Sequence, residues 1–140
     1  MKKKYLLILF IIISIFIFTG CEKKTKLVEN KDYFIRGEFT GKYLDIKNRG
    51  YYIDTLDEPN APSYYILCMG EQNTGGYSLK IKEVNQVEDK TEIIVKEIEP
   101  YKGEIVTMSF TYPTIIVEFP KKQENIVIKN TKGEEFTRLN

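Results

Sequence analysis

Short apolar segments separated by turn residues dominate the chain from Tyr33 to its end. Their lengths suit strands, and none keeps the apolar period of 3.6 residues that an amphipathic helix needs. The sequence therefore predicts an all-β domain over residues 33–140, built as a small antiparallel β-sandwich. The expected strands are Phe34 to Glu38, Tyr43 to Lys47, Tyr51 to Thr55, Ser63 to Met69, Gly76 to Val84, Glu92 to Ile98, Val106 to Tyr112, Ile115 to Phe119, Ile126 to Lys129 and Glu135 to Leu139.

Two of these segments and one turn carry specific patterns. Ser63 to Met69 is apolar without polar alternation, which is typical of a central strand covered on both faces. Between Val106 and Tyr112, apolar and hydroxyl side chains alternate more cleanly than anywhere else, which predicts a half-buried strand. Near the end of the chain, the turn residues Asn130 to Gly133 predict a terminal hairpin.

The first twenty residues have the layout of a signal peptide: three lysines, an apolar run from Leu6 to Phe18, and small residues before Cys21. The four residues Phe18-Thr19-Gly20-Cys21 resemble a bacterial lipobox. We therefore expect residues 1–20 to be removed and the thiol of Cys21 to carry the fatty acyl chains of a lipoprotein. This would hold the protein on the extracytoplasmic face of the cell membrane.

The alternative for this leader is an uncleaved transmembrane anchor. The uncharged stretch from Tyr5 to Cys21 is shorter than the roughly 20 residues that a spanning helix needs. Both alternatives leave the rest of the chain outside the cytoplasm. Residues 21–32 are rich in charged side chains and poor in apolar ones, which predicts a flexible tether between the membrane and the β-domain.

Charge and residue usage exclude several classes of function. Removing residues 1–20 takes away three of 21 basic residues and leaves 20 acidic ones, so the mature chain is nearly neutral. It lacks the basic surface that a nucleic-acid-binding protein needs. With Cys21 bound to lipid, Cys68 is the one remaining thiol, so no internal disulfide is expected.

The chain contains no histidine, which is the commonest general base and metal ligand. We therefore expect no enzyme activity, no cofactor and no metal. Cys68 has no basic neighbour in the sequence that would lower its pKa, so a small buried apolar residue is the expected interpretation.

An unusual loop follows the predicted central strand. Two adjacent glycines allow a positive φ or the close approach of another backbone, and a tyrosine follows them. We therefore predict a partner-binding loop, although a tight turn in which the tyrosine only begins the next strand is an alternative. The candidate contact residues are Gln72, Asn73, Thr74, Gly75, Gly76 and Tyr77.

The same loop lies in a segment that resembles the C-terminal domain of the PrcB family, the protease complex subunit PrcB. The first matching block runs from Tyr64 to Ile81 and contains Thr74-Gly75-Gly76-Tyr77; the second runs from Gly103 to Phe119 and contains Met108-Ser109-Phe110-Thr111-Tyr112-Pro113. Together they cover roughly Tyr64 to Pro120. The resemblance implies a lipoprotein that associates with a secreted protease and stabilises it.

The loop is also similar, more weakly, to the Asn-Pro-Thr-Thr-Gly-aromatic loop of chagasin-type cysteine protease inhibitors. Three of the six positions agree, namely Thr74, Gly76 and Tyr77. This similarity implies an inhibitor that wedges the loop into an active-site cleft. Three hypotheses thus remain: a protein-binding module that engages or stabilises a secreted or surface protease, a chagasin-like inhibitor, and a passive envelope or ligand-binding lipoprotein.

Overall fold

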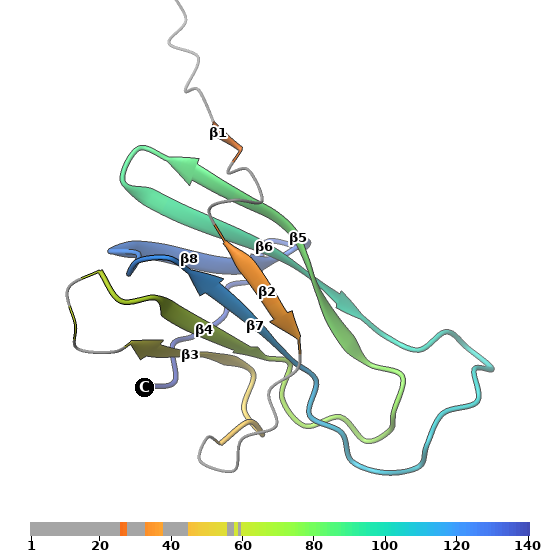
Figure 1. Cartoon of the computed structure of the whole chain (residues 1–140). Helices are drawn as coiled ribbons and strands as arrows, with labels where there is room; N and C mark the ends of the chain where they lie inside the picture. Colours follow the sequence, from red (N-terminus) through yellow and green to blue (C-terminus); the bar gives the residue numbers. More distant parts are fainter. Residues whose placement is uncertain (1–25, 28–32, 38–44, 56–57, 59) are drawn as a thin grey trace, which may run out of the picture.

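The structure is a computed structural model that describes residues 26–27, 33–37, 45–55, 58 and 60–140 (Figure 1). All regular elements in these residues are strands, so the all-β prediction is confirmed. The strands are β1 (Lys26–Leu27), β2 (Phe34–Gly37), β3 (Gly50–Thr55), β4 (Ser63–Cys68), β5 (Ser78–Val87), β6 (Lys90–Ile98), β7 (Thr114–Phe119) and β8 (Asn125–Asn130). No helix in the described part is long and apolar enough to cross a membrane.

The predicted signal peptide 1–20, Cys21 and most of the predicted tether 21–32 lie outside the described residues. The exception is β1, where Lys26 and Leu27 pair with Gln86 and Asn85 of β5.

Two four-stranded sheets pack against each other, with the strand orders β1-β5-β6-β8 and β2-β7-β4-β3 (Figure 1). The pairs within both sheets are antiparallel except β6 with β8, which run parallel. The last residues of the chain join the two sheets on one side. There Phe136 N donates a hydrogen bond to the carbonyl of Ile128 in β8, and Leu139 N donates one to the carbonyl of Tyr51 in β3.

The main core lies between the two sheets and takes side chains from the six strands β3 to β8 and from the C-terminal segment. Tyr65 of β4 is fully buried there, and its ring meets Phe119 of β7 edge-on with the centroids 5.5 Å apart. The other buried members are Tyr51, Leu67, Ile81, Val84, Ile93, Val95, Ile115, Val117, Ile128 and Phe136.

The central position predicted for Ser63 to Met69 is confirmed, because β4 lies between β7 and β3. Its Leu67 faces the main core, whereas Ile66 and Cys68 belong to a second cluster on the opposite face of the sheet. Both faces of this strand are thus covered, which explains its apolar run.

The strand predicted over Gly76 to Val84 is confirmed from Ser78 onward as part of β5, and its Ile81 is buried opposite Val95. A bulge then shifts the register between Ile81 and Glu83. The extra residue brings Val84 to the same face of the sheet, so both side chains enter the core.

The strand predicted between Val106 and Tyr112 is wrong: residues 99–113 form a long irregular connection from β6 to β7. Alternation becomes a strand only where a neighbouring backbone and a core face are present. Here Pro100 and Pro113 lack the N–H groups of a continuous ladder, and the segment crosses from one sheet to the other.

Two further strand predictions are wrong. The first is Tyr43 to Lys47, of which residues 43–44 lie outside the described part and Asp45 to Lys47 form a turn. In this turn the Asp45 carboxylate accepts hydrogen bonds from Lys47 N and from the Asn48 side chain, both at 3.2 Å. Such local bonds compete with strand pairing.

The terminal hairpin predicted at Asn130 to Gly133 is present at its turn, where Glu135 bridges antiparallel to Lys129 and Asn130 N donates to the Glu134 carbonyl. Beyond Phe136 the chain moves on to β3, so Glu135 to Leu139 is no continuous strand.

Replacing the fully buried Ile93 by alanine should lower the free energy of unfolding by about 2–5 kcal/mol, because a cavity is left in the core. Replacing the fully exposed Ile105 by alanine should change it by less than about 0.5 kcal/mol. Urea unfolding of the two variants checks both values. Equal losses would contradict the placement of one isoleucine inside the core and the other outside it.

Candidate functional site

The predicted partner-binding loop, Gln72–Tyr77, is called the glycine loop below, and residues 99–113 are called the long loop. The glycine loop connects β4 to β5 and the long loop connects β6 to β7, so each passes from one sheet to the other. The strand register pairs Cys68 with Thr114 and Ser78 with Ile98. The two loops therefore leave the sheets side by side, at the same end of the molecule (Figure 1).

Backbone hydrogen bonds join the two loops. Gln72 N donates to the Thr111 carbonyl at 2.9 Å, and Thr111 N donates back to the Gln72 carbonyl at 3.0 Å. Gly75 N donates to the carbonyl of Thr107 at 2.9 Å, and the hydroxyl of Thr111 donates to the carbonyl of Thr74 at 2.7 Å. The glycine loop and the long loop thus form one structural unit, called the two-loop surface below.

The two glycines are required by the contact between the loops. A Cβ on the buried Gly75 would lie 2.5 Å from the Thr107 hydroxyl. Gly76 has a φ of +86°, and a Cβ there would lie 2.8 Å from side-chain atoms of both Pro100 and Val106. The space that a side chain would need at these two positions is occupied by the long loop of the same chain.

The other predicted contact residues differ in exposure. Asn73 is exposed at the tip of the glycine loop, whereas Gln72 and Thr74 are half-buried beside the long loop. Tyr77 is half-buried and lines a small hollow. The structure thus brings these residues together, but only Asn73 and the backbone of Gly76 are openly exposed.

A tight turn and a side-chain hydrogen bond hold the long loop at its two ends. Glu104 N donates to the carbonyl of Tyr101 at 3.0 Å, with Gly103 at a φ of +92° inside the turn, and Tyr101 N donates to the Glu104 carboxylate. At the other end the hydroxyl of Tyr112 donates to the Glu71 carboxylate at 2.7 Å. This bond raises the pKa of Tyr112 above its ordinary value.

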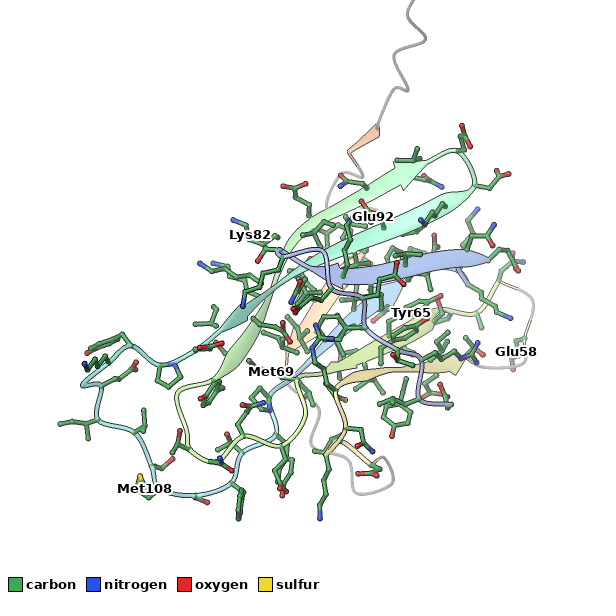
Figure 2. The ribbon with its side chains drawn as sticks, turned by 180° about the vertical axis from the view of Figure 1, so that it is seen from behind. Glu58, Tyr65, Met69, Lys82, Glu92 and Met108 are labelled. Carbon is green, nitrogen blue, oxygen red and sulfur yellow. The ribbon has the colours of Figure 1, made fainter. Side chains whose placement is uncertain are left out.

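Between these fixed points the long loop exposes its large apolar side chains. The exposed fractions are 72% for Tyr101, 100% for Ile105, 88% for Met108 and 60% for Phe110. Figure 2 shows Met108 on this loop, at the end of the molecule away from β1. We call these four side chains the apolar patch. Fully burying a side chain of this size against another molecule contributes about 1.5–3 kcal/mol.

The apolar patch is the feature that sequence reasoning missed. The alternation between Val106 and Tyr112 places apolar residues at every second position, and this pattern predicted a buried face. In the structure Val106, which packs at Gly76, and Tyr112 are partly buried, whereas Met108 and Phe110 stay exposed. The two prolines around the segment were the available signal against a regular strand.

The comparisons with known proteins concern the same part of the chain. The family described as PrcB C-terminal matches residues 63–120, from the first residue of β4 to just beyond the last residue of β7. These residues are called the PrcB C-terminal segment below. The resemblance predicted for Tyr64 to Pro120 is thereby confirmed, and the PrcB C-terminal segment contains both loops of the two-loop surface. Comparison with curated proteins and with solved structures returns no match.

Behind the glycine loop, an ionic cluster connects the PrcB C-terminal segment to the rest of the domain. Arg49, which precedes β3, pairs with Glu97 of β6 at 2.8 Å and lies 4.0 Å from the ring centroid of Phe136. The amide of Asn130 also donates to Glu97, at 2.7 Å. A hollow of about 340 Å³ is lined by Arg49, Glu97, Asn130 and Tyr77 among others.

The pKa of Glu97 is set by opposing influences. Burial is the largest single one and by itself raises the pKa, but the hydrogen bonds from Arg49 and Asn130 and the nearby positive charges together lower it below its usual value. A carboxyl group whose pKa is lowered by folding stabilises the fold above its unfolded pKa of about 4.3, and this stabilisation is lost as the pH falls through the folded pKa.

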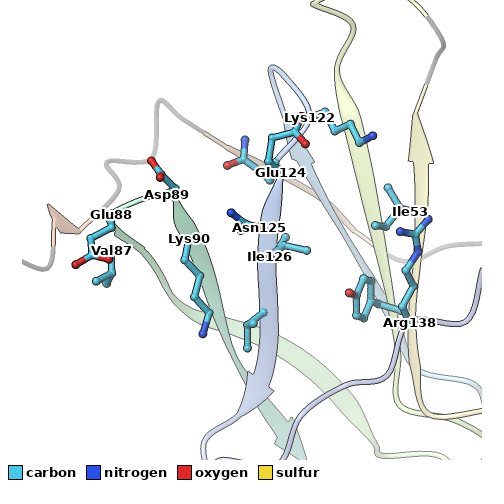
Figure 3. A pocket seen from close by; sticks show the side chains of 13 residues that line it. Ile53, Val87, Glu88, Asp89, Lys90, Lys122, Glu124, Asn125, Ile126 and Arg138 are labelled. Carbon is cyan, nitrogen blue, oxygen red and sulfur yellow. The ribbon is translucent and has the colours of Figure 1, made fainter.

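A larger hollow of about 600 Å³ opens at the other end of the sandwich, beside the turn between β5 and β6 (Figure 3). Its lining mixes charges of both signs, including Lys90 and Arg138 with Glu88 and Glu124. None of the contact residues predicted from the sequence lines this hollow.

Two observations on the described residues concern a reactive thiol and a metal site. Cys68 is buried, as predicted, and burial together with the charge of Asp45 raises its pKa to about 11, so the thiol is protonated at neutral pH. Among the described residues no group of three or more His, Cys, Asp or Glu side chains could hold a metal ion. The predicted lipidation site Cys21 lies outside the described residues.

Gly76→Ala should lower the free energy of unfolding by about 2–3 kcal/mol, because it adds a clash with Pro100 and Val106 to the strain of a positive φ. Gly103→Ala is the matched control, since its φ is +92° but no atom lies within 4 Å of the added Cβ. It should cost only about 1–2 kcal/mol. Urea unfolding measures both, and equal losses would contradict the tight packing of Gly76 against the long loop.

Glu97→Gln should destabilise the fold by about 1 kcal/mol at neutral pH, a modest value because the side chain is partly solvated. The difference from the unmutated protein should shrink as the pH falls below about 4.3, where Glu97 becomes protonated in the unfolded state, and should be lost once the pH has fallen through the lower pKa of Glu97 in the folded state. Unfolding curves recorded across this pH range provide the measurement. Glu99→Gln removes the same charge from an exposed neighbour and serves as the control for the loss of one negative charge in this part of the surface.

Proposed function

We propose that this chain is a lipid-anchored extracytoplasmic protein whose β-domain binds another protein, a secreted or surface protease, and stabilises it. The two-loop surface is the proposed contact. The match of residues 63–120 to the PrcB C-terminal family supports this proposal, because the resemblance to that family implies a subunit of a protease complex.

The observation that carries the proposal is the coincidence of the family match with the apolar patch. The PrcB C-terminal segment supplies both loops of the two-loop surface and all four exposed side chains of the patch. Contiguous exposed apolar surface on a small domain is a mark of an interaction site. The rest of the matched segment, from β4 to β7, supplies the core strands that hold these loops in place.

The proposed anchor is Cys21. Its support is the order of the sequence: a basic start, an apolar run and small residues immediately before the cysteine. Two or three acyl chains would hold the protein stably on the membrane, whereas a single chain binds only weakly.

Binding is proposed in place of catalysis because the chain lacks the groups that most enzymes use. The sequence has no histidine, and the thiol of Cys68 is buried and protonated. The inhibitor hypothesis requires the glycine loop to enter a cleft by itself. In this structure Gly75 is buried and the backbone of Gln72 is bonded to Thr111, so the loop is part of a broader surface.

The proposal is tested in cells that produce the full chain. Labelled palmitate should be incorporated into the unmutated protein and not into Cys21→Ala. Crosslinking on intact cells should recover a protease with the unmutated protein, and that protease should be degraded or lost faster in cells that lack the chain.

Asn73→Ala combined with Tyr77→Ala should weaken this recovery, with Lys82→Ala, an exposed residue of β5, as the control. Label on Cys21→Ala would refute the lipid anchor. Recovery of a partner without protease activity would refute the protease part of the proposal.

A further inference from the structure

The apolar patch gathers most of the exposed large apolar side chains of the described residues on one loop. Six large apolar side chains are exposed in the described part of the chain, and four of them lie within the ten residues from Tyr101 to Phe110. Single exposed apolar residues are normal on protein surfaces, but several on one loop mark a contact. No part of the described chain covers them.

The patch is also presented on a fixed backbone. The turn from Tyr101 to Glu104 holds its first part, and the bonds of Thr107 and Thr111 to the glycine loop hold its second part. A loop that is already ordered loses little conformational entropy when it binds. Such a loop is suited to enter a preformed cleft.

The position of the patch argues against the anchoring membrane as its occupant. Cys21 precedes β1 by five residues, which span at most about 17 Å when fully extended. β1 pairs with Gln86 near one end of β5, whereas the long loop starts beside Ser78 at the other end, about 26 Å away along the strand. Figures 1 and 2 show β1 and the long loop at opposite ends of the domain.

The charges around the patch lead to the same conclusion. The two loops and Glu71 beside them carry three carboxylates, Glu71, Glu99 and Glu104, against the single ammonium of Lys102. Loops and helices that insert into anionic membranes carry an excess of Lys and Arg instead. Two copies of this surface would also repel each other, whereas a partner with basic side chains would be attracted.

We propose that the side chains of Ile105, Met108 and Phe110 insert into an apolar cleft with a basic rim on the extracytoplasmic protein partner, on the side of the domain that faces away from the membrane. This inference rests on the proposed function, because it names the part of the partner that the two-loop surface contacts. Tyr101 and the three carboxylates lie at the edge of the contact, where they set its orientation.

A photo-crosslinking amino acid in place of Ile105 or of Met108, in the full lipidated chain in intact cells, tests the inference. Both positions should label one and the same protein. The same group in place of Glu88, in the turn at the far end of β5, should not label it. The partner is then identified from the labelled product and purified.

Affinity is measured by titrating that purified partner onto the detergent-solubilised full chain. Ile105→Asp should raise the dissociation constant about tenfold or more, as expected for a central apolar anchor. Glu99→Gln with Glu104→Gln should slow association and reduce its dependence on salt, while Lys102→Gln should do the reverse. Because Ile105 is fully exposed, unchanged thermal unfolding of Ile105→Asp verifies that only binding is affected.

The remaining outcomes each overturn the inference. Labelling of lipid from position 105 would assign the patch to the membrane, and labelling of a second copy would assign it to self-association. A protease that is recovered normally and binds Ile105→Asp with unchanged affinity would leave the proposed function standing and remove the patch from the contact. Recovery of no protein partner at all would refute both.

Discussion

The reciprocal backbone hydrogen bonds between Gln72 and Thr111 join the glycine loop to the long loop, close to where β4 ends and β7 begins. They satisfy backbone groups at a place where both chains leave the sheets, and they bring Gly75 and Gly76 against Thr107, Pro100 and Val106. The long loop held in this way keeps Val106 packed at Gly76 and leaves Ile105, Met108 and Phe110 exposed.

The strands of the core could be predicted because their patterns are local. Ser63 to Met69 is apolar at nearly every position, and the structure places it between two strands with both faces covered. Tyr51 to Thr55, Glu92 to Ile98 and Ile115 to Phe119 were also located, with their ends shifted by one or two residues. The parallel pairing of β6 with β8 could not be predicted, because strand order depends on contacts between distant segments.

The candidate site was predicted only in part. Gly75 and Gly76 were recognised as positions that allow a positive φ or the close approach of another segment; in the structure Gly76 has a positive φ, and side chains of the same chain's long loop pack closely against both glycines. Val106 to Tyr112 was misread because an alternating pattern does not reveal whether a second sheet will cover it. Tertiary context thus makes a strand of Ile115 to Phe119 and not of Val106 to Tyr112, although the alternation of Val106 to Tyr112 is the cleaner of the two in the sequence.

Residues 137–140 add to the edge of β3. The backbones of Thr137 and Leu139 form hydrogen bonds with that of Tyr51. The side chain of Asn140 donates to the carbonyl of Ile53 and accepts from its amide. These contacts join residues more than eighty positions apart in the sequence. Contacts of such long range form late, after the entropy of closing a large loop has been overcome. The sandwich is therefore finished only when residues 136–140 are in place, and loss of these residues would leave the edges of β8 and β3 open to unwanted pairing.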